Sequence, residues 1–306
     1  SSNDCNEDGT TYVAWCWNMG GTSAANTSGS INSTVMANTT YGQSIVSWTG
    51  SGANATVGHG LSSAPEMMLV KNTSDDDNWS VYCKTGGVID ETDFLRLDST
   101  MAAVDDSARW NDTAPTSSVF SVGTDNQTNG SSNSMIAYCF HSVSGYSKIG
   151  TYDGDGTTDG SHAINLGFRP AWVMIKCIND AESWWIWDNV RNQVRPNATN
   201  NRTAADSSGA ETTNVATGAD YIEFTATGFK HLGGGGGGNG SGGGQKYIYL
   251  AFAGGLDSIA PVNTTGDIDA RVKASSTYGQ SIVRYAATGT TGHTVGHGLG
   301  GVPDAL

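Results

Sequence analysis

Basic residues are scarce in this chain. Lys and Arg together account for 15 of the 306 residues, against 29 Asp and Glu, and the formal net charge is −14. Nucleic-acid binding depends on a basic surface that releases counterions from phosphates, and anionic membranes attract basic segments for a similar electrostatic reason. We therefore expect no nucleic-acid partner and no docking on a membrane surface.

Long apolar runs, paired cysteines and helix-forming stretches are lacking too. No apolar run approaches the roughly 18 residues that a membrane-spanning helix needs, so no membrane insertion is expected. The five cysteines are odd in number and form no Cys-x-x-Cys pair, so neither a zinc site nor a disulfide framework is indicated. Gly, Ser, Thr and Asn interrupt every segment, which disfavours long helices.

Apolar side chains, in contrast, are plentiful enough for a folded core. Hydrophobic residues make up 37% of the chain, with nine Trp and eleven Tyr. They occur in short β-branched and aromatic segments bounded by turn-forming residues, which is typical of strands joined by polar loops. The sequence therefore predicts an all-β fold.

An internal repeat is the most informative feature of the sequence. The segment Tyr41–Val46 recurs almost unchanged as Tyr278–Val283, and the block Val57–Leu61 recurs as Val295–Leu299. A weaker copy begins at Tyr146. Four later landmarks of this copy keep one constant spacing from their counterparts in the first copy: Leu166, Pro170, Lys176 and Trp184.

A strand-like segment precedes each copy of the repeat. The three segments are Tyr12–Trp17, Met135–Phe140 and Tyr247–Phe252, all rich in aromatic and β-branched residues. Where the first two carry Cys16 and Cys139, the third carries Ala. A thiol that a methyl group can replace indicates a small core residue without a chemical role.

These landmarks divide the chain into tandem units. We predict a terminal strand of a preceding repeat in residues 1–30, β-repeat units in 31–140 and 141–253, and the start of an incomplete third repeat in 254–306. Short strands in units of this length are typical of tandem β-sandwich or jelly-roll-like modules. We expect a segment of a longer repetitive polypeptide, or a protomer whose ends are completed by neighbours.

Pro and Gly residues at the boundaries of apolar segments predict further strands within the units. In the first unit they are Glu66–Lys71, Trp79–Lys84 and Thr116–Val122. In the second they are Ala171–Ile178, Trp184–Asp188 and Tyr221–Thr227.

The segment Asp153-Gly-Asp155-Gly-Thr-Thr-Asp159-Gly is the clearest candidate for a metal site. Carboxylates at alternate positions of a Gly-rich loop supply the oxygen ligands that Ca²⁺ requires, so Ca²⁺ with these three Asp is the one cofactor considered. The corresponding segments 47–58 and 285–296 contain no Asp or Glu. A hairpin turn that happens to be acidic in one unit is therefore the favoured interpretation.

Other acidic residues favour neither a metal nor an enzyme. The cluster Asp75–Asp77 has acidic counterparts at Asp180 and Glu182, and a solvated loop is favoured there over a metal site. Glycoside hydrolysis needs two carboxyl groups about 5–10 Å apart around a sugar. No pair stands out among the candidates, so we predict no catalytic residue and no enzyme. The candidates are Asp90, Glu91, Asp93, Asp98, Asp188 and Glu223.

Histidines, tryptophans and glycines complete the set of candidate features. His59 and His297 recur in Gly-His-Gly-Leu blocks, where turn capping or packing is favoured over metal binding. Trp185 and Trp187, with Trp79 of the first unit, form a candidate contact surface; core or interface packing is favoured there over carbohydrate stacking. The Gly-rich tract 233–244 is interpreted as a flexible loop, with packed extended polyglycine as the alternative.

The second unit resembles a known repeat family in the order of its motifs. The resemblance is carried by Tyr146–Tyr152, Leu166–Lys176, Arg191 and Tyr247–Ala253, and it extends over roughly residues 12–306. These motifs look like a tandem β-domain repeat of uncharacterised function found in tail-fibre-like and other structural proteins of marine bacteriophages, of cyanophage and pelagiphage type. The family has no catalytic signature, and the Gly-rich tract departs from its usual pattern.

The resemblance implies a virion structural protein with an extracellular or virion location. It would be a component of a tail fibre or surface fibre that builds an extended repeat scaffold. Self-association or other virion proteins are then the expected partners, with a host-surface glycan as a further one. A glycan-binding cell-surface or secreted adhesin is the alternative, and a fibre-borne polysaccharide depolymerase is a third.

Overall fold

The computed structural model describes most of the chain as short antiparallel strands joined by turns. The described residues are 7–191, 193–195, 198–199, 201–212, 222–235, 237–240, 244–254, 262–268, 270–275 and 277–303. Within them the helices are two four-residue turns, α1 (Ser107–Trp110) and α2 (Asn126–Asn129). The predicted all-β, sandwich-type fold is confirmed.

The first unit is built on an eight-stranded sheet. A two-stranded ladder of β5 (Ala55–Gly58) and β10 (Val119–Val122) packs against it, with the rings of Trp48 and Phe120 5.5 Å apart in the shared core. The order of strands in the large sheet is β2 (Ala24–Asn26), β3 (Ser33–Asn38), β4 (Gln43–Thr49), β11 (Ser134–Phe140), β6 (Met67–Asn72), β7 (Ser80–Cys83), β8 (Asp93–Arg96) and β9 (Val104–Asp105).

The second unit is a sandwich of two five-stranded sheets. Its core lies between them and includes Trp187, Phe229 and Tyr249. The first sheet has the order β12 (Ser147–Asp153), β21 (Lys246–Ala253), β14 (Pro170–Cys177), β15 (Trp185–Asp188) and β18 (Thr203–Ala204). The second has the order β13 (Ala163–Asn165), β20 (Gly228–His231), β19 (Ile222–Phe224), β17 (Ala198–Thr199) and β16 (Gln193–Arg195).

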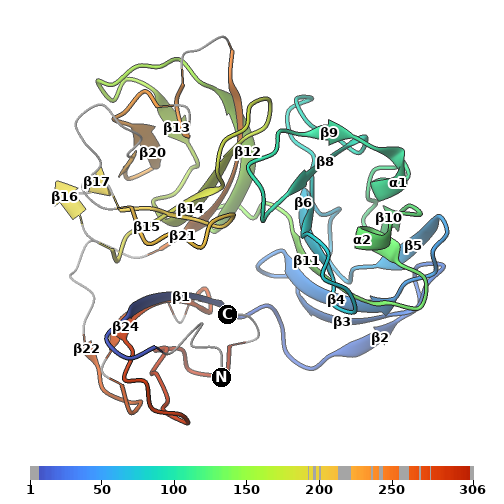
Figure 1. Ribbon diagram of the computed structural model, residues 1–306, viewed down its shortest axis with the longest axis horizontal. Helices are drawn as coiled ribbons and strands as arrows, with labels where there is room; N and C mark the ends of the chain where they lie inside the picture. The colour runs from blue at the N-terminus through green and yellow to red at the C-terminus, as the bar shows by residue number, and fades with distance from the viewer. Residues whose placement is uncertain are drawn as a thin grey trace.

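A four-stranded sheet, called here the third sheet because it contains the third copy of the repeat, joins the two ends of the chain. Its order is β1 (Thr11–Trp17), β24 (Gln280–Ala286), β23 (Ala270–Ser275) and β22 (Val262–Asn263). Figure 1 shows the dark blue β1 lying beside the orange β24. The strand that precedes the first unit in sequence is thus built into the sheet of the last segment.

Strand β1 pairs with β24 in the same register in which β11, the last strand of the first unit, pairs with β4. We call β1, β11 and β21 the closing strands of their sheets. In the first unit Gln43 lies opposite Phe140, and Val46 lies opposite Ala137. In the third sheet, Gln280 lies opposite Trp17 and Val283 opposite Ala14. In the second unit β21 takes the corresponding place beside β12, with Phe252 opposite Ser147. Each of the three similar segments therefore pairs with the strand that begins a copy of the repeat, in one register in the first unit and the third sheet and shifted by one residue in the second unit.

Three of the sheets meet in one apolar core: the eight-stranded sheet, the sheet of the second unit that contains β12, and the third sheet. Tyr146 lies between the aromatic residues that begin the other two copies, with its ring 4.8 Å from Tyr41 and 5.3 Å from Tyr278. Next to them, the ring of Phe252 lies 5.5 Å from Trp17 and 6.0 Å from Phe140. The largest buried cluster contains residues from all three sheets, and Figure 1 shows three lobes converging on this region.

The predicted strands agree closely with those observed. Two of them are markedly shorter than predicted. Strand β10 begins at Val119 because Thr116 forms a turn: its N–H donates to the Val119 carbonyl 2.8 Å away. Tyr221, the first residue of another predicted strand, lies outside the described residues, and the strand there is Ile222–Phe224. The unit boundaries at 30, 140 and 253 stay a prediction.

The thiols behave as core residues where the structure describes them. Cys16, Cys83, Cys139 and Cys177 are buried and free, while Cys5 lies outside the described residues. Burial raises the pKa of Cys139 to about 12, which keeps the thiol protonated. The predicted core role of Cys16 and Cys139 is confirmed by their burial.

Removal of the Phe252 ring is expected to destabilise the whole chain. The side chain is 2% exposed and contacts rings from both other sheets, so Phe252→Ala should lower the free energy of unfolding by about 3–5 kcal/mol. Urea unfolding followed by tryptophan fluorescence measures this. Cys16→Ala is the control and should cost well under half as much, because Ala251 already fills the equivalent position. Two separate transitions, of which only one shifts, would contradict a shared core.

Candidate functional site

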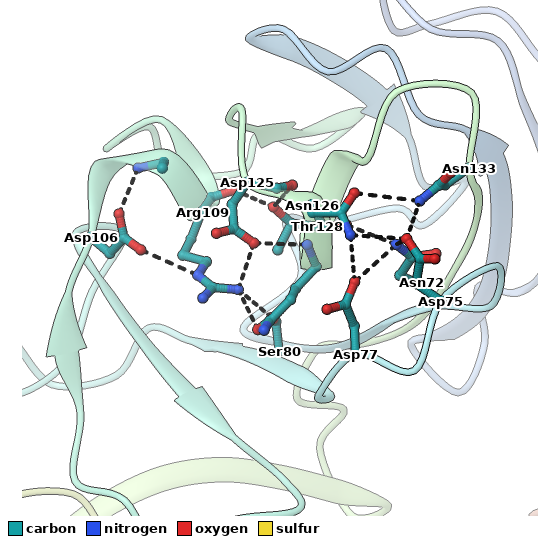
Figure 2. Close-up of polar contacts among 12 residues, drawn as sticks. Asn72, Asp75, Asp77, Ser80, Asp106, Arg109, Asp125, Asn126, Thr128 and Asn133 are labelled. Atoms are coloured by element: carbon teal, nitrogen blue, oxygen red, sulfur yellow. Dashed lines mark hydrogen bonds and ion pairs between the residues drawn. The ribbon is translucent and has the colours of Figure 1, made fainter.

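A buried arginine organises the polar end of the first unit (Figure 2). Arg109 lies on α1 and is only 4% exposed. Its Nη1 lies 2.8 Å from Asp125, and its Nε donates to Asp106 at 3.3 Å. A buried guanidinium requires such opposite charges, since an unpaired charge is costly to remove from water. Asp106 also caps α1 by accepting from the N–H of Ala108.

The same guanidinium connects three elements. Its Nη1 donates to Gln127 on α2 at 2.6 Å and to Ser80 on β7 at 3.2 Å, and its carbon lies 4.1 Å from the centre of the Phe94 ring. Burial lowers the Arg109 pKa, and the Asp125 and Asp106 carboxylates oppose that shift. Sequence reasoning missed this network, although Asp106 and Arg109 have the spacing of one helical turn, which could have indicated it.

An acid–amide cluster lies beside this network (Figure 2). The Oδ2 atom of Asp75 accepts from Asn133 at 2.8 Å and from Asn126 at 3.0 Å. The Oδ2 atom of Asp77 accepts from Asn126 at 2.7 Å and from Asn72 at 3.1 Å. Hydrogen bonds from Asn126 and Asn133 lower the Asp75 pKa. The amides therefore favour the ionised form of Asp75 and hold the two carboxylates close together.

This cluster brings two carboxylates and three side-chain amides together at a loop surface. Two carboxylates beside side-chain amides form a donor set suited to a hard cation, provided that the amide oxygens turn toward it. As they stand, the amide nitrogens face Asp75 and Asp77 and satisfy them without an ion. Among the described residues, no group of three His, Cys, Asp or Glu converges on a point that could hold a metal.

In each of the two units, a lysine on the preceding strand holds the acidic loop. The Nζ of Lys71 donates to the Asp77 carbonyl, and that of Lys176 donates to the Glu182 carbonyl at 2.6 Å. Burial lowers the Lys176 pKa to about 8. The side chain also reaches the Thr100 carbonyl of the first unit at 3.0 Å. The repeated Lys therefore has a structural reason, which is to bind the carbonyl groups of the following loop.

The three predicted calcium ligands are each engaged by a separate partner. Asp153 forms an ion pair with Lys246 at 2.9 Å. Asp159 accepts from the N–H of Ser161 at 2.8 Å. Desolvation raises the pKa of Asp155, but hydrogen bonds from Thr157 and Asn239 bring it down to about 2. Ca²⁺ binding by Asp153, Asp155 and Asp159 stays a prediction.

Asn239 of the Gly-rich tract is fully buried and attaches this tract to the acidic loop. Its side-chain nitrogen donates to Asp155 and to the Thr157 carbonyl, both at 3.0 Å. Its oxygen lies 2.6 Å from the Nδ1 of His162. The described part of the tract is thus held by one specific side chain, which neither the flexible-loop nor the polyglycine interpretation anticipated.

His231 lies under this loop without exposure to solvent. Its ring packs 5.2 Å from that of Tyr152 and 5.6 Å from that of His162. Neither ring nitrogen has a hydrogen-bond partner within the described part of the chain. Burial, together with the neighbouring His162, lowers the His231 pKa to about 3, and Asp155 opposes that shift.

The repeated Gly-His-Gly-Leu histidines cap turns. The Nδ1 of His59 accepts from the N–H of Leu61, and the Nδ1 of His297 accepts from the N–H of Leu299, both at 3.1 Å. Burial lowers the His59 pKa, which favours the neutral ring that this acceptor role requires. The predicted turn-capping role is confirmed by these bonds.

The three tryptophans of the predicted contact surface lie in different surroundings. Trp187 is fully buried in the core of the second unit, so its inclusion in a surface is wrong. The reason is that β15 lies inside its sheet and has both faces covered at this position. Trp185 is partly exposed, with the Arg202 guanidinium 3.6 Å from its ring centre, and Trp79 stacks on Tyr138.

Two cavities lie where the units meet. One of about 380 Å³ is lined by Trp15, Trp17 and Trp172 together with residues of β23 and β24. The other, of about 350 Å³, is apolar and includes Trp79, Tyr138 and Met174 in its lining. Neither lining includes a carboxylate, so neither cavity holds the pair of carboxyl groups that glycoside hydrolysis needs.

The carboxylates considered for hydrolysis have structural partners. Asp188 is fully buried, pairs with Arg191 at 2.6 Å and accepts from Trp15 at 3.2 Å. Glu91 pairs with Lys84 at 2.6 Å. The others bind backbone groups or neighbouring cations, such as Asp98 to the Trp79 N–H, Asp90 to the Thr92 N–H, Asp93 to the Asp90 N–H and Glu223 to Lys230. The absence of catalysis stays a prediction.

The comparisons with known proteins give a family and no function. The family described as Domain of unknown function (DUF7483) matches residues 1–255 and again residues 257–306. The break between the two matches falls close to the predicted start of the third repeat. The search of curated proteins and the search of solved structures each found no match. No helix in the described ranges is long and apolar enough to cross a membrane.

Replacement of Arg109 is expected to break the network of Figure 2. Arg109→Met leaves Asp125 and Asp106 without their cation in a largely buried place, so the free energy of unfolding should fall by about 3–5 kcal/mol. Lys84→Met is the control. It removes an exposed ion pair and should cost within about 1 kcal/mol. Equal losses in the two variants, measured by urea unfolding, would show that Arg109 does not hold these loops together.

His231 is expected to make the fold sensitive to acid. The pKa of His231 is about 3 in the folded chain, against an ordinary value of 6.5. The neutral ring therefore makes its full contribution to the free energy of unfolding above pH 6.5, and this contribution declines as the pH falls toward 3. From pH 6.5 to 5 the loss should be about 2 kcal/mol. His231→Phe should lose less over that range, whereas the exposed control His293→Gln should follow the unmodified chain. Urea midpoints at the two pH values measure this, and equal acid sensitivity in all three proteins would rule it out.

Proposed function

We propose that this chain, which belongs to the DUF7483 family, is a structural component of a virion fibre. In this role its β units form an extended scaffold, outside the host cell, that associates with itself or with other virion proteins and can present a surface to the host. The observation that carries the proposal is the shared core, in which three sheets from successive segments pack around Tyr41, Tyr146 and Tyr278. The virion location rests on the sequence resemblance.

The use of the polar residues supports a structural role. Buried charges form internal ties, such as Arg109 with Asp125 and Arg191 with Asp188. Loop carboxylates accept from neighbouring amides and backbone N–H groups, as Asp75 and Asp155 do. An enzyme site needs polar groups that are free to meet a substrate. The carboxylates of Asp75, Asp125, Asp155 and Asp188 are instead engaged in holding loops and helical turns in place.

The second candidate function is glycan binding by an adhesin, and one cavity favours it. Aromatic rings beside polar groups suit sugars, because the apolar face of a sugar stacks on a ring while its hydroxyl groups form hydrogen bonds. The cavity of about 380 Å³ brings Trp15, Trp17 and Trp172 together with Lys273 and Gln280. Its place between the units would make binding dependent on their relative packing.

Electron microscopy of the purified chain over a range of concentrations tests the scaffold role. We expect elongated particles whose length grows with concentration, because a scaffold protein associates through repeated contacts of one kind. Sedimentation velocity on the same samples gives the mass distribution. Compact single chains at every concentration would contradict the scaffold proposal.

Incubation with host-surface polysaccharide separates the remaining functions on the same preparation. Retention of the chain on the polysaccharide, reduced by Trp172→Ala and unaffected by Trp79→Ala, would favour the adhesin. Release of reducing ends would favour the depolymerase. We expect the chain to associate with itself, without being retained on the polysaccharide and without releasing reducing ends.

A further inference from the structure

Strand β1 is joined to the third sheet by a complete set of contacts. All seven of its residues, Thr11–Trp17, have partners on β24. Beyond the ladder, the N–H of Asn18 donates to the Gly279 carbonyl at 2.7 Å. The first unit has the same bond in the same place, from the N–H of His141 to the Gly42 carbonyl at 2.8 Å. In both its ladder and the hydrogen bond beyond the ladder, β1 therefore lies beside β24 as β11 lies beside β4.

Side chains repeat this equivalence. Cys16 lies opposite Ser281 just as Cys139 lies opposite Ser44, and burial raises the pKa of both thiols. Ala14 packs in a cluster with Val283, while Ala137 packs in one with Val46. The ladder of β1 with β24 thus repeats the Cys–Ser and Ala–Val pairs of the ladder of β11 with β4.

The covalent position of β1 differs from that of the other two closing strands. Strands β11 and β21 follow their partners β4 and β12 in sequence, whereas β1 precedes β24 by most of the chain. In the described part of residues 254–303, no strand takes the place that β1 holds beside β24. The closing strand of this sheet is therefore supplied from a distant part of the sequence.

The segment that follows β1 can serve as a hinge. Gly21, Thr22 and Ser23 are exposed, and a side chain added at Gly21 would meet no atom within 4 Å. An opening at these residues would release β1 together with Asn18 and Met19. The strand could then form the same ladder with another chain, so the exchange keeps the contacts and changes only which chain supplies them.

We propose that β1 of one copy of this chain completes the third sheet of a second copy. Each copy then accepts a strand at β24 and donates its own β1 onward, so copies join head to tail. The contact is heterologous, and a heterologous contact whose rotation does not close generates a linear assembly. The inference rests on the proposed scaffold role and specifies the partner as an identical chain.

Disulfide trapping tests the exchange in full-length chains. Directly opposed antiparallel residues lie about 4.5–5.5 Å apart between Cα atoms, within the range of a disulfide. One chain carries Ala14→Cys, and a second chain with a different tag carries Val283→Cys. Both have Cys5→Ser, Cys16→Ala and Cys139→Ala to remove competing thiols. After refolding as a mixture and oxidation, the proposal expects a mixed dimer whose yield rises with concentration.

The equivalent pair in the first unit provides the matched control. Chains carrying Ala137→Cys and Val46→Cys, mixed in the same way, should give several-fold less mixed dimer, because β11 and β4 belong to one continuous unit. Mixed dimer no greater than in the control would overturn the exchange. So would a double variant, Ala14→Cys with Val283→Cys, that cross-links only within single chains at every concentration.

Sedimentation of the same samples distinguishes this inference from the proposed function. Growing assemblies that lack the disulfide between the two introduced cysteines would overturn strand exchange and leave the scaffold role standing, since another surface would then join the copies. Assemblies that this disulfide captures support both. Single chains without any mixed dimer would overturn both.

Discussion

The structure depends on one apolar core that no single sheet could bury alone. Each of the three sheets turns an aromatic face inward, and Phe252 contacts rings from the other two. Burial of apolar area drives this association, at about 25 cal/mol per Å² removed from water. Because the apolar face of each sheet is covered by the other two, the units are coupled and are not independently folded modules.

Repetition of the sequence makes strands interchangeable. A strand has a side-chain period of two, so register is fixed wherever one face is buried and the hydrophobic pattern matches. Cys16, Cys139 and Ala251 occupy equivalent places in the three closing strands, each opposite a strand that begins a copy of the repeat. A chain built of such copies can close a sheet with any closing strand that reaches it. The pairing of β1 with β24 is one result of that freedom.

The strands were predictable because aromatic and β-branched runs between turn residues determine local structure. The copies Tyr41–Val46 and Tyr278–Val283 form equivalent ladders, β4 with β11 and β24 with β1. The partner of β1 was not predictable, since the same pattern fits three possible neighbours and sequence carries no information on which is nearest. Trp187 was misplaced for a related reason: alternation along a strand shows two faces but not whether both are covered.

Polar ties escaped prediction because they join residues far apart in sequence. Arg109 reaches Ser80, and Asn239 reaches Asp155 across most of the second unit. Single Asn and Arg residues in a chain rich in polar loops carry no pattern that marks them as buried. Their burial has a consequence for function all the same. A buried side chain fixes the loop around it, as Asn239 does in the described part of the Gly-rich tract, and a repeated scaffold needs loops of fixed shape wherever copies meet.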